Sequence, residues 1–451
     1  MAETNLAPRL AAALDRIEQA PHFAVHSRVT RIVGPVIEAA SLPIAIGALC
    51  RVSTGAGAGV DAEVVGFHER GMLLTPLGEL DGIRPGAVVR PLGVAIDVAV
   101  GDGLIGRVLD GLGRPIDGLG PVRATTRRPI AAAPPHPLER ARISQSLGTG
   151  VRAIDGLLTL GLGQRVGVFS GSGVGKSVLL GMIARFTTAD VSVIALLGER
   201  GREVREFIEH DLGDDGLRRS VVVVATSDQA ALLRAKAALV ATTIAEHFRD
   251  AGRHVLLIMD SITRVAMAWR EIGLAAGEPP TTKGYPPSVF AHLPKLLERA
   301  GTGRVGSISG LYSVLVEGDD FNEPVADAAR STLDGHIVLS RRLAHAGRFP
   351  AVDTLESISR VRDLVIDLEQ RQAIETLLRL EAAYRAAEDL ISIGAYQPGT
   401  NRDVDAALAM REDTFAFLRQ RPEEPSSPTE TRSRLLELAS RADSLRAEPA
   451  R

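Results

Sequence analysis

Hydrophobic positions along the 451-residue chain follow three successive patterns. From about residue 24 to residue 95, short apolar runs such as RVTRIVG and AEVVGF are broken by Gly and Pro, which predicts a small β-barrel or sandwich. Residues 151–365 alternate apolar runs with helical stretches, a pattern typical of a parallel α/β sheet. From residue 366 onward the chain is charged and predicted to be helical. We therefore expect an α/β multidomain protein with a barrel, a parallel-sheet core and a helical C-terminal domain.

Six strands are expected in the central domain, at residues 165–169, 191–196, 221–225, 254–259, 311–316 and 336–340. The Gly/Pro-rich stretch 96–150 resembles a linker that leads into this domain. We therefore divide the chain into residues 24–95, 96–365 and 366–451. The last of these is predicted to have a break at 394–401 and a final amphipathic helix at 431–446.

Residues 1–23 form a further segment in this division. Leu6, Leu10, Leu14 and Ile17 recur at helical spacing between residues 2 and 20, and Pro21 ends the pattern. Two interpretations of this amphipathic helix stay open: it packs on its own domain, or it docks another protein.

Composition narrows the class of protein. Lys and Arg number 52 and Asp and Glu 55, so the formal charge is −3. This balance indicates no polyanion-binding surface and leaves a local basic channel open. Aromatic residues make up only 4% of the chain, which disfavours a stacking platform for nucleic acid. Cys50 is the one cysteine, which excludes internal disulfides and fits a reducing compartment. The apolar runs are too short for a membrane span and the first residues lack a signal pattern, so a cytosolic protein is expected.

The strongest local signal is the segment SGSGVGKS at residues 170–177. It follows the apolar run RVGVF and precedes the helical stretch VLLGMIARF, which is the context of a phosphate-binding loop. Glycines let the main-chain N–H groups surround phosphates, and the helix N-terminus favours their negative charge. The first position of the usual GxxxxGK[ST] pattern is Ser170 instead of Gly. The expected nucleotide-binding residues are Ser170, Gly171, Ser172, Gly173, Val174, Gly175, Lys176, Ser177 and Val178.

Two carboxylates stand at the ends of predicted neighbouring strands. Asp260 ends HVLLIMD, and with the Ser177 hydroxyl it is expected to hold the Mg²⁺ of a bound nucleotide, partly through water. Glu199 follows VSVIAL and is expected to orient or deprotonate water. The alternatives are a helix-capping Asp and a solvated Glu. Because parallel strands end at one edge, we expect both side chains beside the loop.

At this point the sequence resembles a known superfamily. The segment PAVDTLESIS at 350–359 is similar to the signature of rotary ATPase α/β-type subunits, as are Gly198-Glu199-Arg200 and Asp260-Ser261-Ile262-Thr263-Arg264. Within that superfamily, residues 269–301 and 316–344 resemble the type III secretion ATPases. The segments CRV, AEVVGF and LLTPLGELDGIRPGAVVRPLG look most like the flagellar export branch. The resemblance spans roughly residues 25–420 and implies a P-loop, RecA-like ATPase core.

The resemblance also implies roles for individual residues. Lys176 matches the phosphate-contacting lysine, Glu199 the catalytic carboxylate and Arg200 the arginine beside it. Arg360 matches an arginine finger, a side chain that reaches the nucleotide of a neighbouring subunit. Phe349 falls where the family places an aromatic against adenine, and Arg264 matches an arginine near the subunit boundary; Tyr396 is a second candidate near adenine. Val265 and Trp269 are atypical of the family.

A function follows from the resemblance as an expectation. The chain would hydrolyse Mg-ATP as a homohexameric ring and energise flagellar protein export, peripheral to the inner face of the membrane export apparatus. Its partners would be a stator-like regulator that binds residues 1–23, export-gate membrane proteins, chaperones and cargo, with no nucleic acid. The alternatives are a virulence-type secretion ATPase, an ATP synthase catalytic subunit, an RNA-translocating helicase and a nucleotide-binding scaffold without turnover.

Overall fold

The computed structural model describes residues 25–55, 59–93, 95–123, 126–316 and 323–447. The chain divides into two compact units, one ending at Ala95 and the other beginning at Ile96. The amphipathic helix expected at residues 2–20 lies outside the described residues.

The first unit is a closed barrel whose described strands follow the order β1-β2-β5-β4-β3-β6. In β3, Cys50 and Val52 are fully buried while Arg51 and Ser53 face solvent, so the period-two pattern of the sequence becomes the two faces of the wall. Burial raises the pKa of the Cys50 thiol to about 11. The strands are β1 (Ser27–Val33), β2 (Val36–Ala39), β3 (Leu49–Ser53), β4 (Gly59–His68), β5 (Gly71–Pro76) and β6 (Val88–Pro91). The predicted β-barrel is confirmed.

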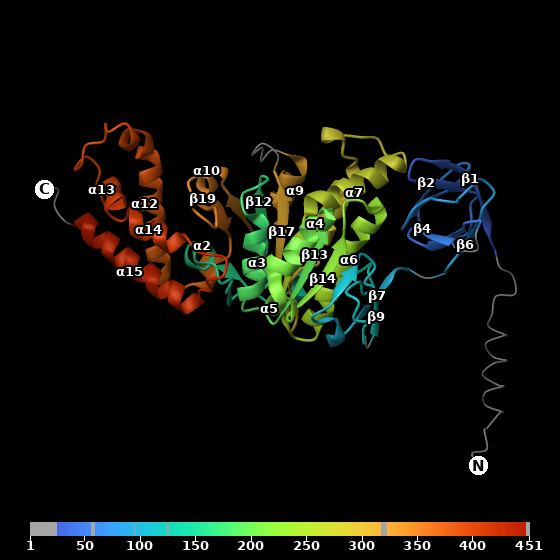
Figure 1. Cartoon of the computed structure of the whole chain (residues 1–451), viewed down its shortest axis with the longest axis horizontal. Helices are drawn as coiled ribbons and strands as arrows, with labels where there is room; N and C mark the ends of the chain where they lie inside the picture. Colours follow the sequence, from blue (N-terminus) through green and yellow to red (C-terminus); the bar gives the residue numbers. More distant parts are fainter. Residues whose placement is uncertain (1–24, 56–58, 94, 124–125, 317–322, 448–451) are drawn as a thin grey trace, which may run out of the picture. The chain divides into compact units, whose positions relative to one another are not determined.

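A nine-stranded sheet forms the centre of the second unit, as far as the structure describes it (Figure 1). Its order is β19-β18-β12-β17-β15-β13-β14-β8, with β16 paired to β17. All neighbours on the main path are parallel except β18 and β19, so the carboxyl ends of β12, β13 and β15 meet at one edge. The strands are β8 (Val108–Asp110), β12 (Arg165–Ser170), β13 (Val191–Leu197), β14 (Ser220–Ala225), β15 (His254–Asp260), β16 (Gly301–Thr302), β17 (Ser307–Leu315), β18 (Gly335–Leu339) and β19 (Val352–Ser359).

Apolar cores cover both faces of this sheet. Along β13, Val193 and Ala195 belong to one buried cluster while Ile194 and Leu196 belong to the other. The first cluster includes side chains of α6 (Ala231–Asp250), α7 (Ile262–Ala275), α8 (Pro287–Leu297) and α9 (Pro324–Thr332). The second includes α2 (Arg152–Leu157) and α3 (Lys176–Phe186). Burial on both faces explains why the strands read as continuous apolar runs instead of alternating ones.

Smaller elements complete the connections. The two-stranded pairs are β7 (Asp97–Val100) with β9 (Thr126–Pro129) and β10 (Ser146–Leu147) with β11 (Leu160–Gly161). Short helical turns are η1 (Asp102–Leu104), η2 (Pro137–Glu139), α4 (Gly201–Glu206), the π-helix η3 (Phe207–Leu212), α5 (Gly213–Leu217), η4 (Thr282–Gly284) and α10 (Arg341–His345).

Helices form the C-terminal part: α11 (Arg362–Val365), α12 (Leu368–Ser392), α13 (Arg402–Ala409), α14 (Arg411–Leu418) and α15 (Pro428–Ala447). The Asp367 side chain caps α12 by accepting a hydrogen bond from the main-chain N–H of Gln370 at 2.8 Å. Arg152, which is 3% exposed, donates to the carbonyl of Phe417 at 2.8 Å and so joins α2 to the end of α14. The loop between α12 and α13 falls at the predicted break, and α15 contains the predicted final helix.

The predicted fold class and all six predicted strands are confirmed. The stretch 96–150, expected as a linker, also contributes β8 to the sheet and β7 and β9 to a separate pair. These strands are only three or four residues long, and short strands among glycines carry too little hydrophobic pattern to be recognised. The edge strand β19 was not predicted, because its second half alternates between partly buried and exposed positions and so lacks a continuous apolar run.

Candidate active site

The segment 170–177 joins β12 to α3 at the carboxyl edge of the sheet. Gly173 and Gly175 have φ angles of 76° and 85°, which residues with a Cβ rarely adopt. Gly175 is also the N-cap of α3 and gives it no side-chain cap, so the first-turn N–H groups face the loop. These groups and the helix dipole together form an anion-binding site.

Ser170, the departure from the usual pattern, is the last residue of β12 and is 2% exposed. It lies in extended backbone, where a side chain carries no conformational penalty, and its carbonyl accepts from the Val316 amide at 3.0 Å. The glycine of the usual pattern is therefore dispensable at this position. Val174 is buried beneath the loop, so only its main chain is available to a ligand.

The loop opens onto a cleft of about 890 Å³, a size typical of ligand pockets. Most of the predicted binding residues line it, from Ser170 to Gly173 and from Gly175 to Val178, together with Glu199, Arg200, Asp260 and Arg264. The cleft thus gathers residues from the ends of β12, β13 and β15, as the strand-end argument predicted.

Lys176, Asp260 and Glu199 form the charged centre of this cleft. The Lys176 ammonium makes a short ion pair with Asp260 and stands 3.6 Å from Oε1 of Glu199. The three side chains are only 12%, 4% and 18% exposed. One buried cation thus faces two carboxylates. A polyphosphate could replace the carboxylates beside Lys176, and its cation could replace Lys176 beside the carboxylates.

Asp260 is held from a second side by a strand that the sequence did not connect with it. The Ser313 hydroxyl, on β17, donates to Oδ1 of Asp260 at 2.5 Å. Ser313 is fully buried, so solvent does not compete for this hydrogen bond. No sequence signal marks Ser313, because only the register of β15 and β17 brings the two residues together.

Glu199 combines burial with an unused acceptor. Burial raises the pKa of Glu199, the charge of Asp260 and a hydrogen bond to Glu203 add to that shift, and Lys176 opposes it. Although burial also acts on Glu203, the hydrogen bonds from the Arg200 amide and from Glu199 hold the pKa of Glu203 below its usual range. Oε1 of Glu199 is buried and accepts no hydrogen bond from any residue that the structure describes. A water molecule could use this acceptor once Lys176, which stands 3.6 Å away, is drawn to a phosphate.

Several cleft residues were absent from the sequence prediction. Glu203 lies in α4, whereas Glu199 precedes that helix, so no helical spacing in the sequence marks their pairing. Arg202 and Arg341 add positive charge to the lining. Arg200 has a side chain 82% exposed, so it stands at the rim and not in the centre.

The two aromatic candidates differ in position. A Cβ placed on Gly175 would lie 3.5 Å from the Phe349 ring, so this ring packs beside the phosphate loop; Phe349 is 44% exposed. The Tyr396 hydroxyl instead donates to Asp405 at 2.9 Å within the helical part, and Tyr396 does not line the cleft. The position of Phe349 fits the role expected for it, and the position of Tyr396 does not.

Arg360 lies away from this cleft. It is exposed and follows β19, whose residue Ser359 pairs with Gly335 at the start of β18. The amide of Arg360 donates to the carbonyl of Asp334 at 3.0 Å. Because β19 runs antiparallel to β18, its end returns to the amino edge of the sheet, opposite the phosphate loop.

Comparison with known proteins identifies the same parts. Models of the ATP synthase alpha/beta family match its beta-barrel domain at residues 29–93 and its nucleotide-binding domain at 150–359. A model of the T3SS EscN ATPase C-terminal domain matches residues 366–437. The flagellum-specific ATP synthase of Bacillus subtilis is 52% identical over 415 residues, which cover 92% of this chain and 95% of that protein. The chain belongs to the family of flagellar and type III secretion ATPases.

Members of this family from both kinds of system are similar to the chain. The type 3 secretion system ATPase of Xanthomonas euvesicatoria is 50% identical and the match covers 88% of this chain and 90% of that protein. The assembled ATPase EscN of the enteropathogenic E. coli type III secretion system superposes with a TM-score of 0.87 at 45% identity, over 92% of this chain and all of EscN. The chain is accordingly a P-loop ATPase. Among its described helices, none is long and apolar enough to cross a membrane.

Proposed function

We propose that this ATPase hydrolyses ATP to ADP and phosphate and thereby energises flagellar type III protein export. The observation that carries the reaction is the cluster of Lys176, Glu199 and Asp260 beside the phosphate loop. The export role is supported by the flagellum-specific ATP synthases of Bacillus subtilis and Salmonella typhimurium, which are 52% and 50% identical to the chain.

In this proposal the residues of the cleft divide the work. The loop N–H groups and Lys176 bind the β- and γ-phosphates, and this binding separates Lys176 from the two carboxylates. Glu199 orients a water through its free Oε1 and accepts a proton from it. The water oxygen bonds to the γ-phosphorus while the bond to the β,γ-bridging oxygen breaks, and ADP leaves with that oxygen.

The residues present fit a Mg²⁺ ion that arrives with the nucleotide. Ser177 and Asp260 both line the cleft and offer hard oxygen donors. Mg²⁺ is usually held by one or two carboxylates together with substrate phosphates and water. When bound, the ion neutralises charge on the phosphates. Ser313 would keep the Asp260 carboxylate oriented toward it.

Arg360 is proposed to act on the nucleotide of a second copy of the chain. Its place at the amino edge of the sheet, remote from its own loop, supports this assignment. One chain carrying both Glu199 and Arg360 is sufficient for identical sites in a closed homohexameric ring. The solved structure of EscN, described as the assembled ATPase, supports such an assembly.

Further partners are proposed on the strength of the relatives. EscN has been solved in complex with its central stalk EscO, and we propose a stalk-like partner for this chain as well. Residues 1–23 are proposed to dock a stator-like regulator, and export-gate proteins, chaperones and cargo complete the set. The proposed location is the cytoplasmic side of the membrane export apparatus.

The shared site is tested by mixing two defective variants before assembly. Arg360→Ala and Glu199→Gln chains should each be inactive, while a 1:1 mixture should recover activity at about a quarter of the interfaces, where an intact Glu199 meets an intact Arg360. ATP turnover of the mixture against each variant alone is the measurement. A mixture no more active than its parts would contradict the ring.

A virulence-type secretion role is the second candidate, favoured by the 50% identity to the Xanthomonas euvesicatoria type 3 secretion system ATPase. Complementation separates the two. The chain should restore motility to a strain that lacks its flagellar export ATPase and should not restore effector secretion to a strain that lacks its virulence-type ATPase. The opposite result would favour the second role.

A further inference from the structure

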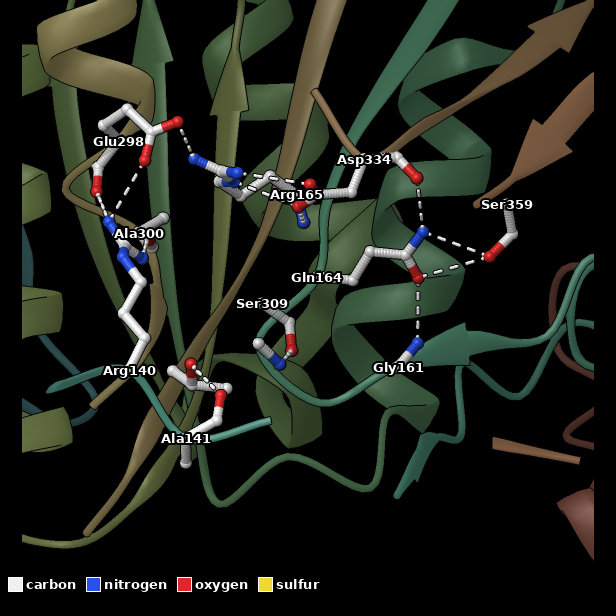
Figure 2. A network of polar contacts seen from close by, with 12 residues as sticks. Arg140, Ala141, Gly161, Gln164, Arg165, Glu298, Ala300, Ser309, Asp334 and Ser359 are labelled. Atoms are coloured by element: carbon white, nitrogen blue, oxygen red, sulfur yellow. Dashed lines mark hydrogen bonds and ion pairs between the residues drawn. The ribbon is translucent and has the colours of Figure 1, made fainter. Parts of the chain in front are cut away.

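The residue before β12, Gln164, belongs to a buried polar network at the amino edge of the sheet (Figure 2). Gln164 is 1% exposed. Its Nε2 donates to the carbonyl of Asp334 at 3.0 Å and to the Ser359 hydroxyl at 3.1 Å, while its Oε1 accepts from the Gly161 amide at 2.9 Å. A single side chain therefore links the starts of β12 and β18 with the end of β19.

The carbonyl of Asp334 is the point at which this network reaches Arg360. It accepts from Nε2 of Gln164 at 3.0 Å and from the amide of Arg360, also at 3.0 Å. A carbonyl oxygen has two lone pairs, and both are used here. Ser359, the residue before Arg360, is also held in place, because its hydroxyl donates to the Thr159 carbonyl at 3.2 Å.

Asp334 itself is fixed by Arg165. The Arg165 guanidinium donates to both carboxylate oxygens of Asp334, at 3.0 and 3.2 Å, and the main chains of the two residues bond at 2.8 Å. A second ion pair, 2.5 Å long, joins Arg165 to Glu298 at the end of α8 (Figure 2). The adjacent Gly335 has no room for a side chain, since a Cβ would collide with the carbonyl of Ile358. The oxygen that receives Arg360 is thus part of a rigid assembly.

The position of β19 explains why such a network matters. β19 is an edge strand, paired on one side to β18, and Arg360 follows its last residue. Sheet pairing alone therefore constrains this end of the strand weakly. A side chain that must reach a reacting phosphate needs its backbone held closely, because a displacement of about 1 Å can cost about 100-fold in rate.

We propose that Gln164 is a positioning residue for Arg360: its buried amide sets the main chain from which Arg360 reaches the nucleotide of a neighbouring copy. The inference rests on the shared site proposed above. The competing explanations are that Gln164 serves only the stability of the fold, or that it acts through β12 on the phosphate loop of its own chain.

The variant Gln164→Met removes the amide at similar volume. Turnover per ring should fall by about 10- to 100-fold while the KM for ATP stays unchanged, because the phosphate loop is untouched. In the Arg360→Ala background the same substitution should cause no additional loss, since Gln164 acts through Arg360. A loss that adds to that of Arg360→Ala would overturn the proposal in favour of a general structural role.

Rings assembled from two variants distinguish an effect of Gln164 on Arg360, at the amino edge of the sheet, from an effect on the phosphate loop at the carboxyl edge. Gln164→Met chains keep a sound phosphate loop and Glu199, so mixing them with Glu199→Gln chains should recover activity, and mixing them with Arg360→Ala chains should not. If Gln164 acts on its own phosphate loop, the mixture with Glu199→Gln will stay inactive, and the proposal is overturned.

Two further variants complete the design. Gln370→Met is the matched control, because Gln370 is buried and its Nε2 donates to the Thr159 hydroxyl at 3.4 Å instead of to Asp334 or Ser359. The turnover of this variant should match that of the wild type. Should Gln164→Met fail to fold, Ser359→Ala tests the same link and should show the same mixing pattern.

If Arg360→Ala retains wild-type turnover, the shared site fails and the positioning role with it. If Arg360→Ala is impaired while Gln164→Met and Ser359→Ala are not, the positioning role alone fails.

Discussion

Lys176 and Arg360 lie at opposite edges of the same sheet. Lys176 follows the carboxyl end of β12, whereas Arg360 is bonded to Asp334, whose partner Arg165 begins β12. The six residues of β12 span roughly 20 Å at about 3.3 Å per residue, which is much longer than an arginine side chain. Arg360 therefore cannot serve the nucleotide bound by its own loop, and any role in the reaction requires a second copy.

Replacing Lys176 should abolish nucleotide binding and turnover together. Lys176→Ala removes the buried cation of the cleft and leaves Asp260 and Glu199 facing each other and the incoming phosphates, a repulsion that opposes binding. Equilibrium binding of a fluorescent ATP analogue measures the effect. Lys295→Ala, at an exposed lysine of α8, is the control and should bind normally. Retained turnover in the Lys176 variant would rule out the loop assignment.

Glu199→Gln should preserve ATP binding and lower kcat by about 100- to 10,000-fold, the usual contribution of a general base. A pH profile adds a second test. Because burial raises the pKa of Glu199, the active carboxylate form should be lost on acidification at a pH above the range of an ordinary Glu. The acid limb of kcat/KM should lie there in the wild type and be absent from the variant. Glu209→Gln, at an exposed position in η3, should keep the limb. A wild-type limb at the ordinary Glu value would contradict the assignment.

The part of the site that sequence could predict is the part built from strand ends. Lys176, Glu199 and Asp260 each follow an apolar run, and parallel strands bring such ends to one edge. The Ser313 contact to Asp260 and the Gln164 link to Asp334 could not be predicted, because each joins residues through strand register across 53 and 170 positions of sequence. The edge strand β8 escaped for a related reason: its partner β14 begins only at Ser220, far along the chain from Val108.

Phe349→Ala should weaken ATP binding without destabilising the fold. The ring is 44% exposed and packs beside Gly175, so its removal leaves no buried cavity. If it stacks on the adenine, the loss should be about 1–3 kcal/mol, seen as a higher KM for ATP with little change in kcat. Phe67→Ala is the matched control, since Phe67 is 43% exposed in the barrel. An unchanged KM would remove Phe349 from the nucleotide site.

Stability should depend strongly on a buried ion pair remote from the cleft. Glu246 on α6 accepts two hydrogen bonds from Arg299, at 2.9 and 2.6 Å, and the two side chains are only 7% and 3% exposed. Glu246→Gln leaves the Arg299 guanidinium buried without a counter-charge, which should lower the free energy of unfolding by about 3–5 kcal/mol. Chemical denaturation, followed through the unfolding transition of the second unit, measures this loss.

An exposed pair provides the control for that substitution. Glu139 and Arg304 also form an ion pair, but their side chains are 47% and 75% exposed. Solvent screens such a pair and its two flexible side chains lose entropy in forming it, so Glu139→Gln should cost less than about 1 kcal/mol. Burial, and not the presence of an ion pair, decides the difference. Equal losses in the two variants would mean that Arg299 recovers solvent or another partner when Glu246 is neutralised.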